Sequence, residues 1–339
     1  MAYQDNDPTA ADRKKDHIEL ALKSETPDID NRFYYEPLFA AHPAEGSWGE
    51  FSFLGKKMQN PLWISSMTGG TAMARTINQN LARACGAFGL GMGLGSCRGL
   101  LFSDEYLSDF DVRHLMGDDA PLYANLGIAQ LEQLIKNNQL YLIDNLIDKL
   151  KADGLIIHVN PMQEWMQPEG DRYEKPAIET IETVLNQTKH KIIVKEVGQG
   201  FGYESLKTLF QLPLQAVDFA AAKGTNFAKL ELLRSDSEKQ RIFNNFVKIG
   251  HDATEMVHLS NLVISELGEK RRCKEVIISG GIKDFLDGFY LIKKINTSAV
   301  YGMASGFLTH ARGEYEPLET FVKTQIAGLE VANAFLKVK

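Results

Sequence analysis

Lys195 is the residue whose surroundings say most about chemistry, because it lies inside the apolar run KIIVKEVG (191–198). A buried ammonium without a polar partner is very costly, so this lysine must have one. Such a lysine can act as a Schiff-base nucleophile, a phosphate ligand or the partner of an anionic cofactor ring. The structural alternative is an ion pair, but the adjacent Glu196 faces the other side of a strand. The sequence therefore favours a ligand-directed role for Lys195.

A second group of polar side chains lies in the run HVNPMQE (158–164). His158 by itself fits a core histidine with satisfied hydrogen bonds. Asn160, Gln163 and Glu164 follow at once, and carboxylate and amide oxygens are the ligands that Mg²⁺ prefers. Glu164 fits an exposed surface acid equally well, so both interpretations stay open.

Two glycine-containing turns near the end of the chain suggest a phosphate site. Ser279-Gly280-Gly281 and the segment 302–306 leave backbone N–H groups accessible, because glycine has no Cβ to block an approaching ligand. A helix starting near Lys283 would direct its positive end to the first turn. The alternative is a pair of tight turns that simply need glycine. The presence of both turns favours phosphate binding.

Arg13, Lys14 and Lys15 form a basic cluster ahead of HIELAL (17–22). Most such clusters are solvated helix ends, and composition favours that interpretation here. The alternative is that Arg13 and Lys14 close over an anionic substrate.

Eight short apolar or β-branched runs have the character of strands, and most end in Gly, Ser, Thr, Asn or Lys. They are 61–67, 89–96, 121–127, 154–160, 191–198, 216–221, 275–282 and 298–305. Segments with helical spacing lie between them, at 129–152, 174–189, 283–295 and 314–338. This alternation predicts an α/β fold, a (β/α)8 TIM barrel, with a doubly wound open sheet as the competitor.

Three regions follow from that alternation. Residues 1–60 are expected to form an N-terminal extension that packs against or covers the barrel, and residues 61–339 the barrel itself. The stretch 226–274 is longer than one repeat needs and is expected to be an insertion between strands six and seven. In such a barrel the active site lies at the carboxyl ends of the strands, where polar and glycine residues gather.

Composition limits the classes of function. The chain has 339 residues and a net charge of −7, so a general nucleic-acid binder is not expected. Its three cysteines are widely spaced, which argues against a disulfide scaffold or a cysteine zinc cluster. The polar N-terminus does not resemble a signal peptide, and no apolar run is long enough to cross a membrane. We therefore expect a cytoplasmic protein with no membrane partner.

Nine motifs, taken in order, resemble type 2 isopentenyl-diphosphate delta-isomerase, an FMN-dependent family. They are RKKDHI (13–18), SSMTGGT (65–71), GLGSCR (93–98), FDVR (110–113), ANLGIAQL (124–131), IHVNPMQE (157–164), IVKEVGQG (193–200), GTNFAKLELLR (224–234) and ISGGI (278–282). The resemblance covers nearly the whole chain. It implies a (β/α)8 barrel that interconverts isopentenyl diphosphate and dimethylallyl diphosphate in isoprenoid biosynthesis, with reduced FMN and Mg²⁺.

The resemblance also implies roles for individual residues. FMN would be held by Ser66, Met67, Thr68, Ser96, Asn125, Lys195, Thr225, Gly280, Gly281, Ala304 and Ser305. The diphosphate would be held by Arg13, Lys14, Ser96, Arg98, His158 and Gln163. Glu164 would bind Mg²⁺, and the catalytic residues would be Gln163, Lys195 and His158. NADPH as reductant and a homo-oligomer, a tetramer or octamer, are further implications.

One segment departs from the family pattern. Members usually carry DVSGxGGT after strand six, whereas this chain has DFAAAKGT (218–225). Ala220 cannot supply the hydrogen bond of a serine, and Lys223 is expected to place a new cation near the flavin or its phosphate. The competing function is another FMN barrel oxidoreductase, such as a 2-hydroxy-acid oxidase. That reaction wants a late His–Arg pair, for which Lys283, His310 and Arg312 are the nearest candidates.

Overall fold

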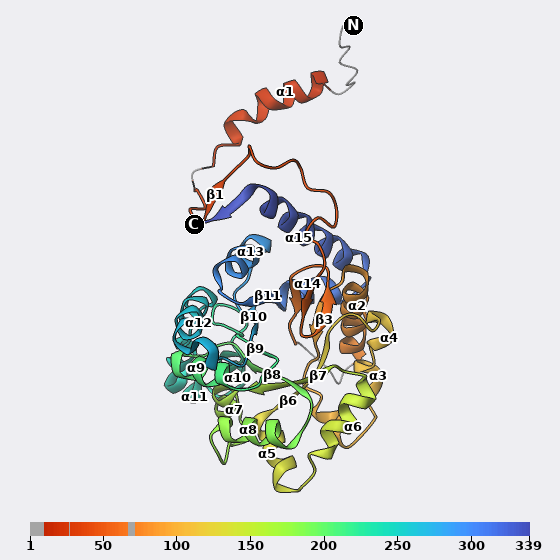
Figure 1. Cartoon of the computed structure of the whole chain (residues 1–339), viewed down its shortest axis with the longest axis vertical. Coiled ribbons are helices and arrows are strands. Elements are labelled where there is room, and N and C mark those ends of the chain that lie inside the picture. Colours follow the sequence, from red (N-terminus) through yellow and green to blue (C-terminus); the bar gives the residue numbers. More distant parts are fainter. Residues whose placement is uncertain (1–9, 27, 67–71) are drawn as a thin grey trace.

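The computed structural model describes residues 10–26, 28–66 and 72–339. Eight parallel strands close into a barrel in the order β10-β11-β4-β5-β6-β7-β8-β9, which excludes the open sheet. The barrel strands are β4 (Leu62–Ile64), β5 (Gly91–Gly93), β6 (Leu122–Gly127), β7 (Gly154–Val159), β8 (Lys191–Glu196), β9 (Ala216–Asp218), β10 (Glu275–Ser279) and β11 (Ser298–Met303). All eight predicted strands are thus confirmed, and Figure 1 shows the helices arranged around them.

The helices of the barrel and its loops follow the chain from strand to strand. They are α2 (Ala72–Phe88), α3 (Leu107–Phe110), α4 (Arg113–Met116), α5 (Ile128–Lys136), α6 (Tyr141–Leu150), α7 (Pro161–Met166), α8 (Ala177–Gln187), α9 (Tyr203–Gln211), α10 (Phe227–Arg234), α11 (Ser237–Phe243), α12 (Ala253–Leu267), α13 (Phe285–Lys294), α14 (Ser305–Ala311) and α15 (Glu316–Phe335). Short 3₁₀ turns are η2 (Arg98–Leu101), η3 (Phe246–Lys248) and η4 (Gly268–Lys270).

The barrel interior is a separate apolar cluster from the layer between strands and helices. Four barrel strands each contribute one fully buried side chain to this inner cluster: Trp63 from β4, Tyr123 from β6, Ile156 from β7 and Ile193 from β8. The hairpin of β2 (Phe51–Phe53) and β3 (Lys56–Met58) adds Phe53, Leu54 and Met58 to this same cluster. The hairpin therefore closes the amino-terminal end of the barrel, while the carboxyl end stays available for a site.

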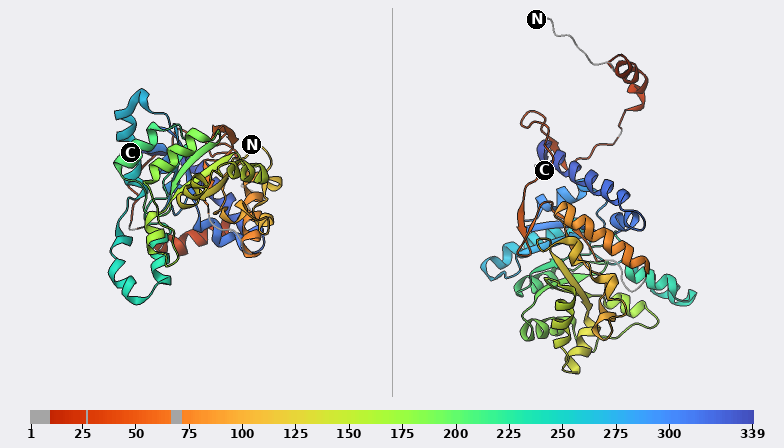
Figure 2. Two further views of the ribbon diagram at one scale, coloured as in Figure 1. Left: turned by 90° about the horizontal axis from the view of Figure 1, so that it is seen from below. Right: turned by 90° about the vertical axis from the view of Figure 1, so that its right-hand side faces the viewer.

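The N-terminal extension has three parts. β1 (Phe33–Tyr35) pairs antiparallel with β12 (Leu336–Val338) at the other end of the chain. The hairpin packs into the barrel. Helix α1 (Ala10–Leu20) and the turn η1 (Ala21–Lys23) lie clear of the barrel, as Figure 1 and the right-hand view of Figure 2 show. The extension thus contacts the barrel through its second half.

Two expected elements differ in detail. The helical segment 129–152 is two helices, because Asn138 takes the left-handed conformation (φ +55°) and ends α5. Asn tolerates that conformation better than most residues, so the break is local and inexpensive. The insertion 226–274 includes α12, which packs against α9 and β10 as a normal barrel helix. The added structure between strands six and seven is therefore α10, α11 and η3.

Candidate active site

The carboxyl end of the barrel carries one pocket with two adjoining recesses. We call the first the glycine recess; it is lined by Ser65, Ser66, Lys195, Val197, Gly198, Ala220, Ala221, Gly224, Thr225, Phe227, Ser279, Gly280, Gly281, Ile282, Gly302, Met303, Ala304 and Ser305. We call the second the polar recess; it is lined by Ser66, Gly95, Ser96, Arg98, Asn125, Gln130, His158, Asn160, Gln163, Glu164, Lys195, Val197 and Phe227. Ser66, Lys195, Val197 and Phe227 belong to both.

The glycine recess depends on a tight contact between two loops. Gly280 and Gly281 have positive φ angles of +93° and +75°. A Cβ at Gly280 would lie 2.1 Å from the carbonyl oxygen of Ala221, so no larger residue fits there. The turn after β10 therefore needs glycine for packing as well as for backbone conformation.

The helix after that turn does not supply its positive end as predicted. α13 begins at Phe285, and the Asp284 carboxylate accepts hydrogen bonds from the N–H groups of Leu286 and Asp287. Its first turn is thus already capped by an anion. Gly280 and Gly281 contribute to the recess through their own backbone.

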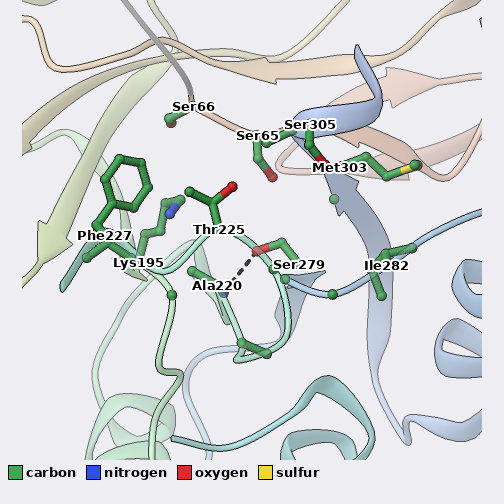
Figure 3. A pocket seen from close by; sticks show the side chains of 18 residues that line it. Ser65, Ser66, Lys195, Ala220, Thr225, Phe227, Ser279, Ile282, Met303 and Ser305 are labelled. Carbon is green, nitrogen blue, oxygen red and sulfur yellow. Dashed lines mark hydrogen bonds between the residues drawn. The ribbon is translucent and has the colours of Figure 1, made fainter. Parts of the chain in front are cut away.

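Two serine hydroxyls in the glycine recess lack a hydrogen-bond partner among the residues that the structure describes. The Oγ atoms of Ser65 and Ser66 are buried and make no hydrogen bond to those residues (Figure 3). A buried polar atom without a partner carries a desolvation cost that a polar ligand can remove. Together with the Gly280–Gly281 turn, these hydroxyls fit a ligand that has both hydrogen-bonding groups and a phosphate.

Lys223 is not among the residues that line the glycine recess, but it lies beside Gly281, where a Cβ would be 3.1 Å from the Lys223 Cβ. Its Nζ donates to Asp252 Oδ2 at 2.6 Å, and its side chain is 74% exposed. The ammonium is thus held by Asp252 at the edge of the turn that carries Gly281. The expectation that Lys223 places a cation near the flavin or its phosphate stays a prediction.

Lys195 lies at the junction of the two recesses and is 7% exposed. Its Nζ donates to the carbonyl oxygen of Glu196 at 2.6 Å, not to the neighbouring carboxylate. The Glu196 Oε2 atom instead accepts from the backbone N–H groups at positions 198, 199 and 200. The prediction that the two side chains do not pair is confirmed, and Figure 3 shows the ammonium at the pocket.

A second buried carboxylate lies beside Lys195. Asp218 is its partner in the β8–β9 register and is fully buried. Its Oδ1 accepts from the Ser279 hydroxyl, and its Oδ2 has no partner. Burial raises the pKa of Asp218, while the Lys195 ammonium opposes that shift. Lys195 therefore places a positive charge beside the buried carboxyl group of Asp218.

His158 is held in one tautomer. Asn125 donates its Nδ2–H to the carbonyl of Leu94 at 3.0 Å, so its Oδ1 is the acceptor that faces His158 Nδ1 at 2.8 Å. The His158 Nδ1 must then carry the hydrogen, which leaves a lone pair on Nε2. Burial, and secondarily the Lys195 charge, lower the pKa of His158 to about 3. The ring is neutral at physiological pH.

Asn160 organises the remaining polar side chains of the recess. Its Nδ2 donates to Gln163 Oε1 at 3.1 Å and to Glu164 Oε1 at 3.0 Å. The Tyr173 hydroxyl donates to Asn160 Oδ1 at 2.7 Å, and Gln163 Nε2 donates to Glu231 Oε1 at 3.2 Å. Hydrogen bonds from Asn160 thus hold both Gln163 and Glu164 on α7, and Glu231 holds Gln163 from the other side.

The structure brings most of the predicted site residues to the pocket. The predicted residues that line it are Ser66, Ser96, Arg98, Asn125, His158, Gln163, Glu164, Lys195, Thr225, Gly280, Gly281, Ala304 and Ser305. Met67 and Thr68 lie outside the described residues. Arg13 and Lys14 are exposed on α1 and are not among the lining residues.

Some lining or supporting residues were not predicted from the sequence. Ser65 and Phe227 line the pocket, and Asp171 lies 3.6 Å from Arg98 Nη1. Tyr173 positions Asn160 through its hydroxyl. Glu231, which the motif GTNFAKLELLR predicted, positions Gln163. The same motif held the signal for Phe227. Nothing in the local sequence marks Asp171 or Tyr173.

A metal site must rest on few protein ligands. Within the described ranges 10–26, 28–66 and 72–339, no group of three or more His, Cys, Asp or Glu side chains is arranged to hold a metal ion. Glu164 is half-buried in the polar recess and is the carboxylate nearest to such a role there. Mg²⁺ commonly takes one or two carboxylates, with substrate phosphates and water completing its shell.

Comparison with known sequences identifies the family. An isopentenyl-diphosphate delta-isomerase from Rickettsia africae (strain ESF-5) is 34% identical over 310 residues, covering 88% of this chain and 86% of the relative. The enzyme of the same name from Rickettsia felis is 33% identical over 329 residues, covering 94% and 91%. The chain belongs to the isopentenyl-diphosphate delta-isomerase family. No family model matches the chain.

Two flavoenzyme structures are among the solved structures that match this chain in fold. A mandelate oxidase variant with an FMN adduct matches with TM-score 0.54 and 13% identity, covering 91% of this chain and 88% of that one. A flavocytochrome b2 variant with sulfite bound matches with TM-score 0.60 and 14% identity, covering 89% and 71%. At such low identity the similarity shows the fold alone, a (β/α)8 barrel, in agreement with the strand order.

The residues that a 2-hydroxy-acid oxidase would be expected to use do not line the pocket. Lys283, His310 and Arg312 line neither recess, and the His310 ring stacks on Phe321 with centroids 4.7 Å apart.

In the part of the chain that the structure describes, no helix is long and apolar enough to cross a membrane.

Proposed function

We propose that this isomerase holds reduced FMN in the glycine recess and isopentenyl or dimethylallyl diphosphate in the polar recess, and interconverts the two diphosphates. The observation that carries the proposal is that the recesses meet at Ser66, Lys195, Val197 and Phe227. A flavin ring in one recess and an alkene in the other would come into contact at that junction. The positions of Lys195 and Phe227 there support both ligands at once.

The glycine recess fits FMN by the chemistry of its lining. The Gly280–Gly281 turn and Ala304–Ser305 would receive the phosphate through backbone N–H groups, and the two unpartnered hydroxyls of Ser65 and Ser66 offer hydrogen bonds. Thr225 lines the same recess, and Met67 and Thr68 are added by family resemblance. Ser96 and Asn125, which the resemblance also assigns to FMN, line the polar recess and would reach the cofactor from that side. When bound, reduced FMN would supply an electron-rich ring against a developing positive charge and a group able to carry a proton.

The polar recess would hold the diphosphate between Ser96, Arg98, His158 and Gln163. Neutral His158 has a lone pair, not a hydrogen, on Nε2. To donate to a phosphate oxygen it must take up a proton, which the phosphate charge favours by raising the pKa of the ring. Diphosphate binding is therefore expected to be coupled to proton uptake.

Glu164 is the proposed ligand for Mg²⁺, with the diphosphate supplying further oxygens. Mg²⁺ commonly takes one or two protein carboxylates together with phosphate oxygens, and when bound it would supply positive charge that offsets the charge of the diphosphate. Asn160 and the backbone N–H of Asp171 hold the two Glu164 oxygens at 3.0 and 2.8 Å. Those hydrogen bonds fix the position of the Glu164 carboxylate.

In the reaction the alkene gains a proton at one carbon and loses one at another, through a tertiary carbocation, with no net redox change. Lys195 would stabilise negative charge on the flavin by attraction. Gln163, held between Asn160 and Glu231, would orient the reacting alkene first and relay a proton second, because an amide is a weak acid and a weak base. Phe227 would exclude water from the cation.

Arg13 and Lys14 reach the diphosphate only if α1 changes its position, so their role remains a prediction. NADPH as reductant, a tetrameric or octameric assembly and a cytoplasmic location are proposed from the family resemblance.

The test is an anaerobic assay of the full chain with FMN, a reductant, Mg²⁺ and isopentenyl diphosphate, followed by NMR. We expect dimethylallyl diphosphate to form, and to require both FMN and Mg²⁺. Flavin binding without any product would contradict the isomerase proposal.

A further inference from the structure

The turn after β9 contains two residues in a backbone conformation that suits glycine. We call residues 220–223 the β9 turn. Ala220 has φ +41° and Lys223 has φ +75°, both in the left-handed region. A Cβ makes that region unfavourable, because it comes too close to the carbonyl oxygen of the backbone. Some interaction must therefore keep the turn in this conformation.

Hydrogen bonds hold the inner half of the turn. The Ser279 hydroxyl accepts from the Ala220 N–H at 2.9 Å, drawn as a dashed line in Figure 3, and the Ser279 carbonyl accepts from the Ala221 N–H at 2.8 Å. These bonds join the turn to β10, next to Gly280. They do not reach Lys223.

The outer half is held by the segment that leads into α12. The Ala222 N–H donates to the carbonyl of His251 at 2.8 Å, and Lys223 Nζ donates to Asp252 Oδ2 at 2.6 Å. Asp252 Oδ1 also accepts from the Glu255 N–H at 2.9 Å and so caps α12. The mutual hydrogen bond raises the pKa of Lys223 and lowers that of Asp252, so both are charged at neutral pH.

The β9 turn is also a wall of the glycine recess. The turn residues Ala220 and Ala221 line it. Gly224 and Thr225, which come directly after Lys223, line it too. A Cβ on Gly224 would lie 2.8 Å from the N atom of Gly281, which shows how closely the turn meets the proposed phosphate loop. A change of backbone conformation at Lys223 would move both.

We infer that the Lys223–Asp252 ion pair is a clasp that holds the β9 turn in its left-handed conformation and so keeps the FMN recess in its binding shape. Lys223 is a positioning residue: it acts on the cofactor through the backbone and not by contact. The inference rests on the proposed FMN site. It also explains how a lysine serves at a position whose backbone favours glycine.

The test measures FMN affinity in the full chain after removal of bound flavin, by the quenching of flavin fluorescence during titration. Lys223→Ala keeps the backbone cost but loses the clasp, so FMN should bind about threefold to fivefold more weakly. Lys223→Gly loses the same clasp but removes the backbone cost, and its affinity should stay within about twofold of the unaltered protein.

A second variant approaches the clasp from Asp252. Asp252→Asn keeps a side-chain oxygen to cap α12, since Asn is an equally good cap, but removes the charge. It should weaken FMN binding to about the same extent as Lys223→Ala, and the double variant should be no weaker than either alone. Lys323→Ala is the matched control, because it removes an exposed 2.7 Å ion pair with Glu319 on α15 and should leave FMN affinity unchanged.

The outcomes separate the clasp from the cofactor assignment. Equal losses in Lys223→Ala and Lys223→Gly would overturn the backbone argument and show that the lysine side chain itself matters to FMN. Unchanged affinity in Lys223→Ala would overturn the clasp while leaving the FMN site intact. Failure of the unaltered protein to bind FMN would overturn both.

Discussion

The two recesses of the pocket are built by different means. Among the described residues that line the glycine recess, Lys195 is the one charged side chain, and the shape comes from backbone turns and small residues. The polar recess is made of side chains held by one another, as in the Asn125–His158 pair at 2.8 Å. The first is therefore sensitive to backbone conformation, and the second to the loss of single hydrogen-bonding groups.

The largest effect is expected where the recesses meet. Lys195→Ala removes the buried cation shared by both, and turnover should fall about 10²–10³-fold, the usual cost of losing a group that stabilises charge in the active site. The measurement is kcat/KM together with flavin content from absorbance. Normal turnover with normal flavin content would show that Lys195 has no part in the chemistry.

The next effect should be confined to the polar recess. Glu164→Gln removes the proposed Mg²⁺ ligand, so activity should fall about 10–100-fold and more Mg²⁺ should be needed for half-maximal rate, with FMN affinity unchanged. Glu174→Gln is the matched control, because Glu174 is exposed, pairs with Lys136 at 3.1 Å and lies outside the lining of both recesses. Unaltered Mg²⁺ dependence in Glu164→Gln would remove Glu164 from the metal site.

A smaller effect should be confined to the glycine recess. Ser65→Ala deletes a hydroxyl that has no protein partner, so little stability is lost. If the hydroxyl bonds FMN, affinity for the flavin should fall about fivefold, equivalent to ~1 kcal/mol. Binding of inorganic diphosphate, measured by calorimetry, should not change. Weaker diphosphate binding with unchanged FMN affinity would reverse the assignment of the two recesses.

The smallest effect concerns stability and pH. His158 has a pKa of about 3 in the folded protein against an ordinary 6.5. Between these values the unfolded chain binds a proton that the folded chain does not, so this residue lowers stability as pH falls below 6.5. The contribution to the free energy of unfolding is up to about 1.4 kcal/mol per pH unit.

His158→Gln removes that contribution, so the stability difference between pH 7 and pH 5 should be smaller in the variant. Urea midpoints at the two pH values measure it. An equal pH dependence in both proteins would mean that His158 is not held neutral, and the proposed proton uptake on diphosphate binding would lose its basis.

The sequence predicted elements whose signal is local. β6 and β7 are buried on both faces and appear as apolar runs, and the polar residues at their ends line the pocket as expected. The hairpin that closes the barrel was not predicted, because Phe53, Leu54 and Met58 are buried by contacts with strands far along the chain. The Lys223–Asp252 ion pair was not predicted for the same reason, because the two residues are 29 positions apart.

The most direct test of the account counts reducing equivalents. With a known amount of reduced FMN, Mg²⁺ and excess isopentenyl diphosphate under anaerobic conditions, product is followed by NMR and the flavin by absorbance. We predict many molecules of dimethylallyl diphosphate per flavin, with the flavin still reduced at the end. Product equal to the flavin oxidised, or no product from a protein that binds both ligands, would contradict an isomerase whose cofactor and substrate meet at Lys195.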